Sequence, residues 1–167
     1  MGEFKLLNVG VIKGSHLEEY YRVMMESNGK KYQLELNFQN KTIEECKRGI
    51  LKDFMLNLGH FEKANCSALQ ENFKQGGPVK SYLDFHYDLL GRENLLKQFN
   101  INPELPDVKV QLFTQMQLIR IALYPDGKYN MAYYATFDYV LDGDLCDEIL
   151  SIKTDQFGAI QYIDWER

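Results

Sequence analysis

The chain has little of what marks a membrane protein or a nucleic-acid-binding protein. No stretch of its 167 residues approaches the roughly 18 consecutive apolar residues that a membrane helix requires. Nineteen lysines and arginines against 24 aspartates and glutamates give a formal charge of −5, which disfavours binding to the phosphates of nucleic acid. We therefore expect neither a membrane partner nor a nucleic-acid partner, and another protein with a basic surface is electrostatically the easier partner.

The chain has three cysteines, and their spacing does not suggest a metal-binding or redox pair. Cys46, Cys66 and Cys146 are widely separated, and none forms a Cys-x-x-Cys pair. We expect reduced and mostly buried thiols. The first residues carry neither the basic start nor the long apolar segment of a signal peptide, so the sequence favours a cytoplasmic location.

The motifs of the common catalytic and cofactor sites are also missing. The sequence contains no Gly-x-Ser-x-Gly elbow, no Gly-x-Gly-x-x-Gly fingerprint and no phosphate-binding loop. Its three histidines, His16, His60 and His86, do not have the spacing of a zinc protease. We expect no cofactor and no catalytic residues, and these absences favour a protein that is not an enzyme.

Strand-like patterns come first along the chain. An apolar strand is expected around residues 4–12, and two further runs flank Asn28 and Gly29, a pair that suits a tight hairpin turn. The second arm of this hairpin has alternating apolar and polar residues, which predicts one buried and one wet face. The two sets are Tyr32, Leu34, Leu36 and Phe38, and Gln33, Glu35, Asn37 and Gln39.

A helical section is expected over residues 41–100. Thr42 followed three residues later by Glu45 has the form of a capping box, which predicts a helix start there. Apolar residues then recur at spacings of three and four, the pattern of an amphipathic helix. Gly76 and Gly77 interrupt this pattern together with a proline, and they are a candidate hinge.

The remaining residues, 108–167, predict a four-stranded antiparallel meander with turns at Asp126-Gly127 and around residues 156–158. Strands, then helices, then strands indicate an α+β fold. We expect one domain over residues 1–167, in which helices cover one face of an antiparallel sheet. That sheet is built from the N-terminal strands of residues 1–40 and the C-terminal meander.

An acidic segment over residues 137–150 is the most unusual stretch. Counted from Asp142, an EF-hand calcium loop would need a glycine at position six and a glutamate at position twelve, where Asp147 and Lys153 stand. A looser calcium or magnesium site stays open, but we interpret the segment as a loop between strands with its carboxylates in water. If this loop has a function, we expect it to be an acidic docking surface for a partner, made by Asp142, Asp144, Asp147 and Glu148.

His86 and the aromatic residues suggest two alternative functions, a metal-dependent hydrolase and a homodimer. His86 shares a helical stripe with apolar residues, where a histidine is more often part of the core than a ligand or a base. If it does act, it would serve a metal-dependent hydrolase with the carboxylates of residues 138–148. In the aromatic-rich strands, Tyr134 is the ring expected to be exposed, and the aromatic sheet face could form a homodimer.

The C-terminal pattern "LIRIALYPDG" followed by "ATFDYVLDGDLCDEILSIKTDQFGAIQYIDWE" resembles a bacterial family of unknown function. The resemblance covers roughly the last third of the chain, and it implies the fold and a bacterial cytoplasmic setting but no activity. Its positions are Tyr124, Pro125, Asp126, Phe137, Asp138, Tyr139, Asp147 and Glu166. We expect a non-catalytic protein-binding domain of the immunity or regulatory type, with the hydrolase as the alternative.

Overall fold

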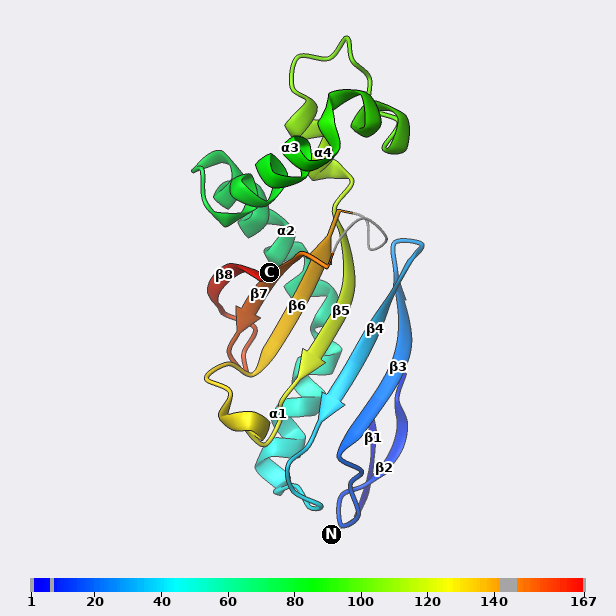
Figure 1. Ribbon diagram of the computed structural model, residues 1–167. Coiled ribbons are helices and arrows are strands. Elements are labelled where there is room, and N and C mark those ends of the chain that lie inside the picture. The colour runs from blue at the N-terminus through cyan, green and yellow to red at the C-terminus, as the bar shows by residue number, and fades with distance from the viewer. Residues whose placement is uncertain (1, 7, 142–146, 167) are drawn as a thin grey trace.

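A six-stranded sheet with helices behind it forms the body of the molecule (Figure 1). The computed structural model describes residues 2–6, 8–141 and 147–166. The strands lie in sequence order across the sheet: β3 (Tyr20–Ser27), β4 (Lys30–Asn37), β5 (Gln117–Leu123), β6 (Ala135–Val140), β7 (Ile149–Thr154) and β8 (Ile160–Glu166). The helices are α1 (Glu45–Leu56), α2 (Leu58–Lys74), α3 (Pro78–Gln98) and α4 (Val108–Thr114). The predicted α+β class is confirmed.

The sheet joins the two ends of the chain through one parallel pair. β4 and β5 run parallel, and the other neighbouring strands run antiparallel. A parallel pair needs a long crossover, and here the helical section provides it between the end of β4 and the start of β5. The predicted C-terminal meander is present as β5, β6, β7 and β8.

The hairpin of β3 and β4 forms as the sequence predicts. Asn28 and Gly29 have φ angles of 53° and 74°, the left-handed conformation that a tight hairpin turn requires. The alternation in β4 holds in part: Leu34 and Leu36 are fully buried in the core, but Glu35 and Asn37 of the expected wet face are buried as well. The same alternation continues across the sheet and gives it two chemically different faces.

The first helix begins later than the capping box predicts. α1 begins at Glu45, and its N-cap residue Glu44 makes no side-chain cap. The backbone N–H of Ile43 instead donates to the carbonyl of Gly14 at 3.3 Å. The residues before α1 are therefore held against the N-terminal region, which overrides the local signal at Thr42.

The predicted N-terminal strand is also divided. Residues 4–12 lie in two short strands, β1 (Glu3–Leu6) and β2 (Gly10–Lys13), which pair with each other in a separate two-stranded sheet. Gly10 has a φ of 100°, which permits the reversal between them.

The second predicted turn forms at Asp126-Gly127, where the Gly127 N–H donates to the Tyr124 carbonyl at 3.1 Å, but it does not join the two strands directly. β5 and β6 are joined by residues 124–134, which include a 3-10 turn, η1 (Lys128–Asn130). The Asp126 carboxylate accepts hydrogen bonds from the backbone N–H groups of Gln39 and Asn40, both at 2.8 to 2.9 Å. Asp126 therefore ties this connection to the segment after β4 instead of forming a two-residue hairpin turn.

The candidate hinge at Gly76-Gly77 is a tight turn between α2 and α3. Gly76 has a φ of 77°, and the Asn72 side chain accepts a hydrogen bond from Val79 N–H at 3.0 Å, which caps α3. Within α3, Gly91 has a φ of 70°, so the helix restarts there.

The core lies between the sheet and the first two helices. Phe54 of α1 packs on Phe61 of α2 with ring centroids 4.7 Å apart, and on Phe137 of β6 at 6.4 Å. Cys46 and Cys66 are exposed, contrary to the expectation of mostly buried thiols, and Cys146 lies outside the described residues. No helix in the described ranges is long and apolar enough to cross a membrane.

Two turn glycines give a matched test of this packing. Gly158 has a φ of 79°, and a Cβ there would overlap the ring of Phe61, whereas Gly127 has a φ of 78° and open space around it. We expect Gly127→Ala to lower the free energy of unfolding by about 1 kcal/mol, from backbone strain alone. Gly158→Ala should lower it by roughly 2–4 kcal/mol, because overpacking adds to the same strain. Urea denaturation of both variants measures the difference. Equal losses of unfolding free energy would contradict the close contact between Gly158 and the Phe61 ring.

Candidate functional site

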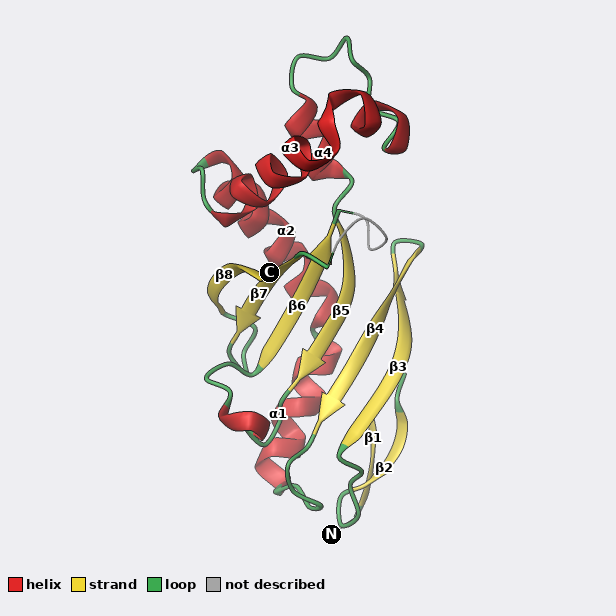
Figure 2. Ribbon diagram, viewed as in Figure 1, coloured by secondary structure: helices red, strands yellow, loops and turns green. Residues whose placement is uncertain are grey.

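The sheet has one face without a helical cover. Figure 2 shows α1 and α2 behind the sheet, and no described α-helix lies across the opposite side. We call this opposite side the open face. Because strand residues alternate between faces, the open face receives the residues that lie between the buried apolar ones of each strand. These residues are mostly polar, and several of them are nevertheless buried.

Asp138 of β6 is the centre of the open face. Its side chain is fully buried, and it accepts hydrogen bonds from the guanidinium of Arg120 on β5, with two N–O distances of 2.6 Å. The hydroxyls of Thr136 and Ser151 donate to its other oxygen at 3.0 and 2.6 Å. The buried carboxylate is thus paired and hydrogen-bonded, as burial of a charge requires.

Arg120 extends the network toward the N-terminal strands. Its guanidinium lies 3.7 Å from the buried carboxylate of Glu35 on β4, which also accepts a hydrogen bond from Tyr20 on β3 at 2.7 Å. Arg22 lies 3.6 Å from the same carboxylate. Burial acts to lower the pKa of Arg120, but Asp138 and Glu35 outweigh it, so this pKa lies above its usual value.

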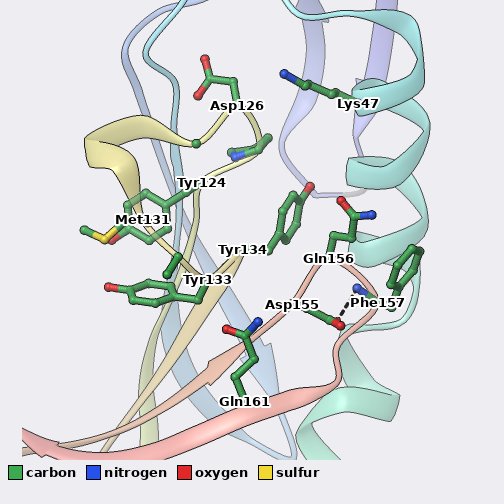
Figure 3. Close-up of a pocket in the computed structure, with 13 residues that line it drawn as sticks. Lys47, Tyr124, Asp126, Met131, Tyr133, Tyr134, Asp155, Gln156, Phe157 and Gln161 are labelled. Atoms are coloured by element: carbon green, nitrogen blue, oxygen red, sulfur yellow. Dashed lines mark hydrogen bonds between the residues drawn. The ribbon is translucent and has the colours of Figure 1, made fainter.

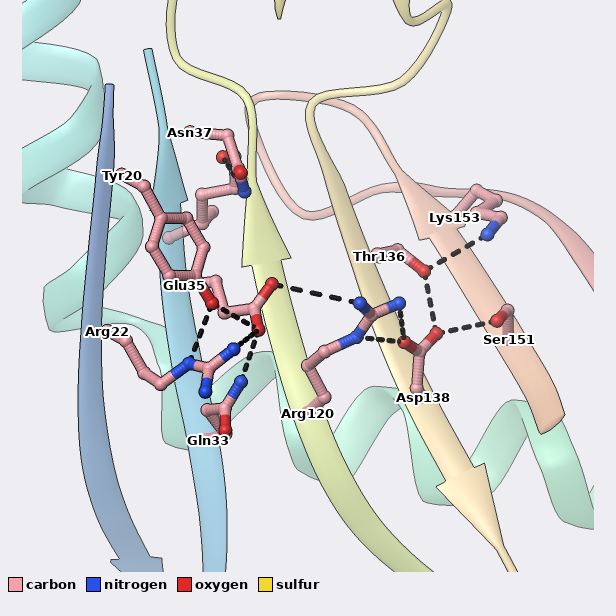
Figure 4. A network of polar contacts seen from close by, with 11 residues as sticks. Tyr20, Arg22, Gln33, Glu35, Asn37, Arg120, Thr136, Asp138, Ser151 and Lys153 are labelled. Atoms are coloured by element: carbon pink, nitrogen blue, oxygen red, sulfur yellow. Dashed lines mark hydrogen bonds and ion pairs between the residues drawn. The ribbon is translucent and has the colours of Figure 1, made fainter. Parts of the chain in front are cut away.

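Lys153 of β7 completes the network on the C-terminal side. Its ammonium donates to the Thr136 hydroxyl at 3.2 Å and forms an ion pair with Glu166 of β8. The polar contacts therefore connect all six strands of the sheet, and Figure 4 shows them from Tyr20 of β3 to Lys153 of β7. All of these contacts except that between Thr136 and Asp138 join side chains on neighbouring strands, so the network fixes the positions of the open-face residues relative to one another.

Tyrosine rings gather at one end of the open face. Tyr124 lies with its ring centroid 6.3 Å from that of Tyr129 and 5.8 Å from that of Tyr133, and Tyr133 lies 6.4 Å from Tyr162. We call these four residues the tyrosine cluster. Tyr129 and Tyr162 are 63% and 45% exposed, whereas burial raises the pKa of Tyr124 to about 12. The cluster therefore has a fixed interior and an exposed rim.

A cleft of about 480 Å³ adjoins the tyrosine cluster (Figure 3). Its walls come from the connection between β5 and β6 and from the turn between β7 and β8. Tyr124, Tyr133 and Tyr134 line it, together with the carboxylates of Asp126 and Asp155. Lys47 of α1 also lines it, so the cleft lies at the end of the sheet, between these connections and α1.

The predicted acidic docking surface is only partly within the described residues. Asp142 and Asp144 lie outside them, and Asp147 is exposed. The Glu148 carboxylate accepts a hydrogen bond from the indole N–H of Trp165, so one of its oxygens is used in a contact within the chain.

His86 lies in the core of the helical end of the molecule. It is 1% exposed, its Nδ1 lies 2.9 Å from the carbonyl oxygen of Tyr82, and its ring lies 4.3 Å from that of Tyr82. Burial lowers the pKa of His86, against the effects of the Tyr82 carbonyl and Glu148. Within the described residues, no group of three or more histidines, cysteines and acids could hold a metal ion.

Tyr134 is not the exposed aromatic residue that the sequence predicts. Its ring packs on Phe54 with centroids 5.1 Å apart, and its hydroxyl oxygen is buried. The alternation that suggested exposure does not extend this far, because β6 begins only at Ala135 and the residues before it include η1.

The network itself was missed by sequence reasoning, although the sequence contains a signal for it. Arg120, Asp138 and Lys153 are each the one charged residue of a strand in which the other residues are uncharged and mostly apolar. One charge in the middle of each of several apolar strands indicates that the strands share a face on which these charges pair. Comparisons with protein-family models, curated proteins and solved structures found no match, so the resemblance to a bacterial family stays a prediction.

The pair of Asp138 and Arg120 supports a stability test. Asp138→Ala leaves the guanidinium without its main partner, and we expect the free energy of unfolding to fall by about 3 kcal/mol. This loss is at the lower end of the range for a broken buried ion pair, because the Arg120 side chain is 38% exposed and water screens its charge. The double variant Arg120→Met, Asp138→Ala should be more stable than Asp138→Ala alone. Urea denaturation measures both.

Asp164 on β8 provides the matched control. It lies opposite Ser151 in the strand register and is exposed. Asp164→Asn removes a carboxylate from the same face, and its effect should stay within about 0.5 kcal/mol. A loss at Asp138 as small as the loss at Asp164 would show that the network does not stabilise the sheet.

Proposed function

We propose that this chain is a non-catalytic domain that binds another protein through the open face, as an immunity-type or regulatory partner. The observation that supports this most is the tyrosine cluster beside a fixed array of paired charges. Tyrosine and arginine are the residues most enriched where protein interfaces concentrate their binding energy. Here both types stand on a sheet face that no described α-helix crosses (Figure 2).

The charge network makes this face suitable for tight association. Side chains that must be ordered on binding reduce affinity, and an array that is already fixed avoids much of that loss. Arg120 and Asp138 hold their positions through contacts of 2.6 Å, and Tyr133 lies beneath the ammonium of Lys153 at 4.9 Å. A partner would therefore meet a surface whose shape is set before contact.

A basic partner fits the charge of the chain. The net charge of −5 steers positively charged surfaces toward it, and Asp164 and Glu166 add exposed carboxylates along the edge strand β8. Asp147 lies exposed just before β7. The bacterial cytoplasmic setting is part of the same proposal and depends on the resemblance of the C-terminal region.

The test is a pull-down from a lysate of the organism that encodes the chain, followed by an affinity measurement with the protein that is captured. The double variant Tyr129→Ala, Tyr162→Ala removes the exposed rim of the tyrosine cluster. We expect the affinity to fall about tenfold or more, because such rings are typical binding hot spots. Higher salt should also weaken binding, since surface charges attract the partner.

A matched control variant is Leu89→Ala, Leu105→Ala. These leucines are 55% and 51% exposed, so they lose similar surface away from the open face. The variant Asp142→Asn, Asp144→Asn, Asp147→Asn, Glu148→Gln tests the acidic segment as the docking surface. Equal affinity of the tyrosine variant and the wild type would contradict our proposal, and a solution mass of twice 19.6 kDa would point to the homodimer instead.

A further inference from the structure

The cleft beside the tyrosine cluster has aromatic walls and acidic groups in one place. Figure 3 shows Tyr124, Tyr133 and Met131 on one side of it, and Asp155, Gln156 and Phe157 on the other. Its volume of about 480 Å³ is large enough to hold a side chain. The chemistry of the walls indicates which side chain that is.

Asp155 has acceptor capacity left over. Its Oδ1 accepts hydrogen bonds from the N–H groups of Phe157 and Ala159 at 2.8 and 2.9 Å, which fixes the turn between β7 and β8. Among the described residues, no hydrogen bond reaches its Oδ2 and no ion pair involves it. The carboxylate is therefore held in place by one oxygen while the other can receive a donor.

The charge of the cleft is negative. Asp126 and Asp155 line it, and Lys47 of α1 is its one lining cation within the described part of the chain. The carboxylate of Asp126 already accepts the N–H groups of Gln39 and Asn40, so it contributes charge more than a free acceptor. A cationic group gains electrostatically by entering, and Lys47 reduces that gain.

The tyrosine cluster already holds cations of this chain. The Lys153 ammonium lies 4.9 Å from the centroid of the Tyr133 ring, and the Lys128 ammonium lies 5.1 Å from that of Tyr129. Both distances are within the range in which the electron-rich face of an aromatic ring attracts a positive charge. Tyr133 therefore already attracts one cation through its ring, and Tyr124 beside it lines the same cleft.

We propose that this cleft binds an arginine side chain presented by the protein partner. A planar guanidinium can stack on a tyrosine ring while its N–H groups reach the free oxygen of Asp155, a geometry that the ammonium of lysine does not offer. This inference rests on the proposed function for the origin of the arginine. It requires the partner to present an arginine where it meets the tyrosine cluster.

The test is an NMR titration of the ¹⁵N-labelled full chain with N-acetyl-arginine amide. N-acetyl-citrulline amide is the matched probe, because it has nearly the same shape without the charge. We expect saturable shifts of the backbone signals of Tyr133, Tyr134 and Asp155 with the arginine probe. The citrulline probe should bind more weakly by about fivefold, the size of one partly exposed charge interaction.

Three variants report the sign of the electrostatic effect. Asp155→Asn keeps the Oδ1 acceptor of the turn and removes the charge, and it should weaken arginine binding by about twofold to fivefold. Lys47→Gln should strengthen it by a similar factor. Asp107→Asn should leave it unchanged, since Asp107 makes the same kind of turn contact, to Lys109 and Val110, at the start of α4.

Equal binding of both probes, or shifts away from the cleft, would overturn the inference. So would a change in the same direction in the Asp155 and Lys47 variants. The titration needs no partner protein, so its outcome is separate from the pull-down. Arginine binding without any captured partner would contradict the proposed function alone, and a captured partner without arginine binding would contradict this inference alone.

Discussion

The arginine that spans two strands is the interaction on which the open face depends. Arg120 meets Asp138 at 2.6 Å on one side and Glu35 at 3.7 Å on the other. Both carboxylates are buried, so each would be costly without a cation close by. Because Glu35 belongs to the N-terminal hairpin and Asp138 to the C-terminal meander, this one guanidinium also joins the two halves of the sheet.

The two faces of the sheet have different roles as a result. On the helical side, close packing of rings such as Phe54 and Phe137 supplies the apolar burial that stabilises the fold. On the open face, paired charges and tyrosines leave polar groups and ring edges available to a partner. Tyr82 connects the helical end to the sheet, because its hydroxyl accepts the N–H of Leu141 and donates to the carbonyl of Glu148. These two residues belong to the acidic segment of residues 137–150.

Local patterns predicted the elements well where neighbours in the sequence decide the structure. The turn at Asn28 and Gly29 forms as expected, because positive backbone angles are a local property of that pair. The turn at Asp126-Gly127 also forms, but it lies within a longer connection whose Asp126 carboxylate binds backbone groups 86 and 87 residues earlier in the chain, which no local pattern predicts. The helix start at Thr42 fails for the same kind of reason, a contact with Gly14 that no local pattern contains.

The sequence by itself determined the α+β class, the order of strands and helices, and the alternation that separates the two faces of each strand. Only the tertiary structure decided which face stays open and which charges meet on it. Arg120 and Asp138 are 18 residues apart, and the parallel pairing of β4 with β5 is what brings Glu35 to the same guanidinium. Strand periodicity is fixed by backbone geometry and can be read locally, whereas the partner of a charge depends on strand order and register, which the whole chain sets together.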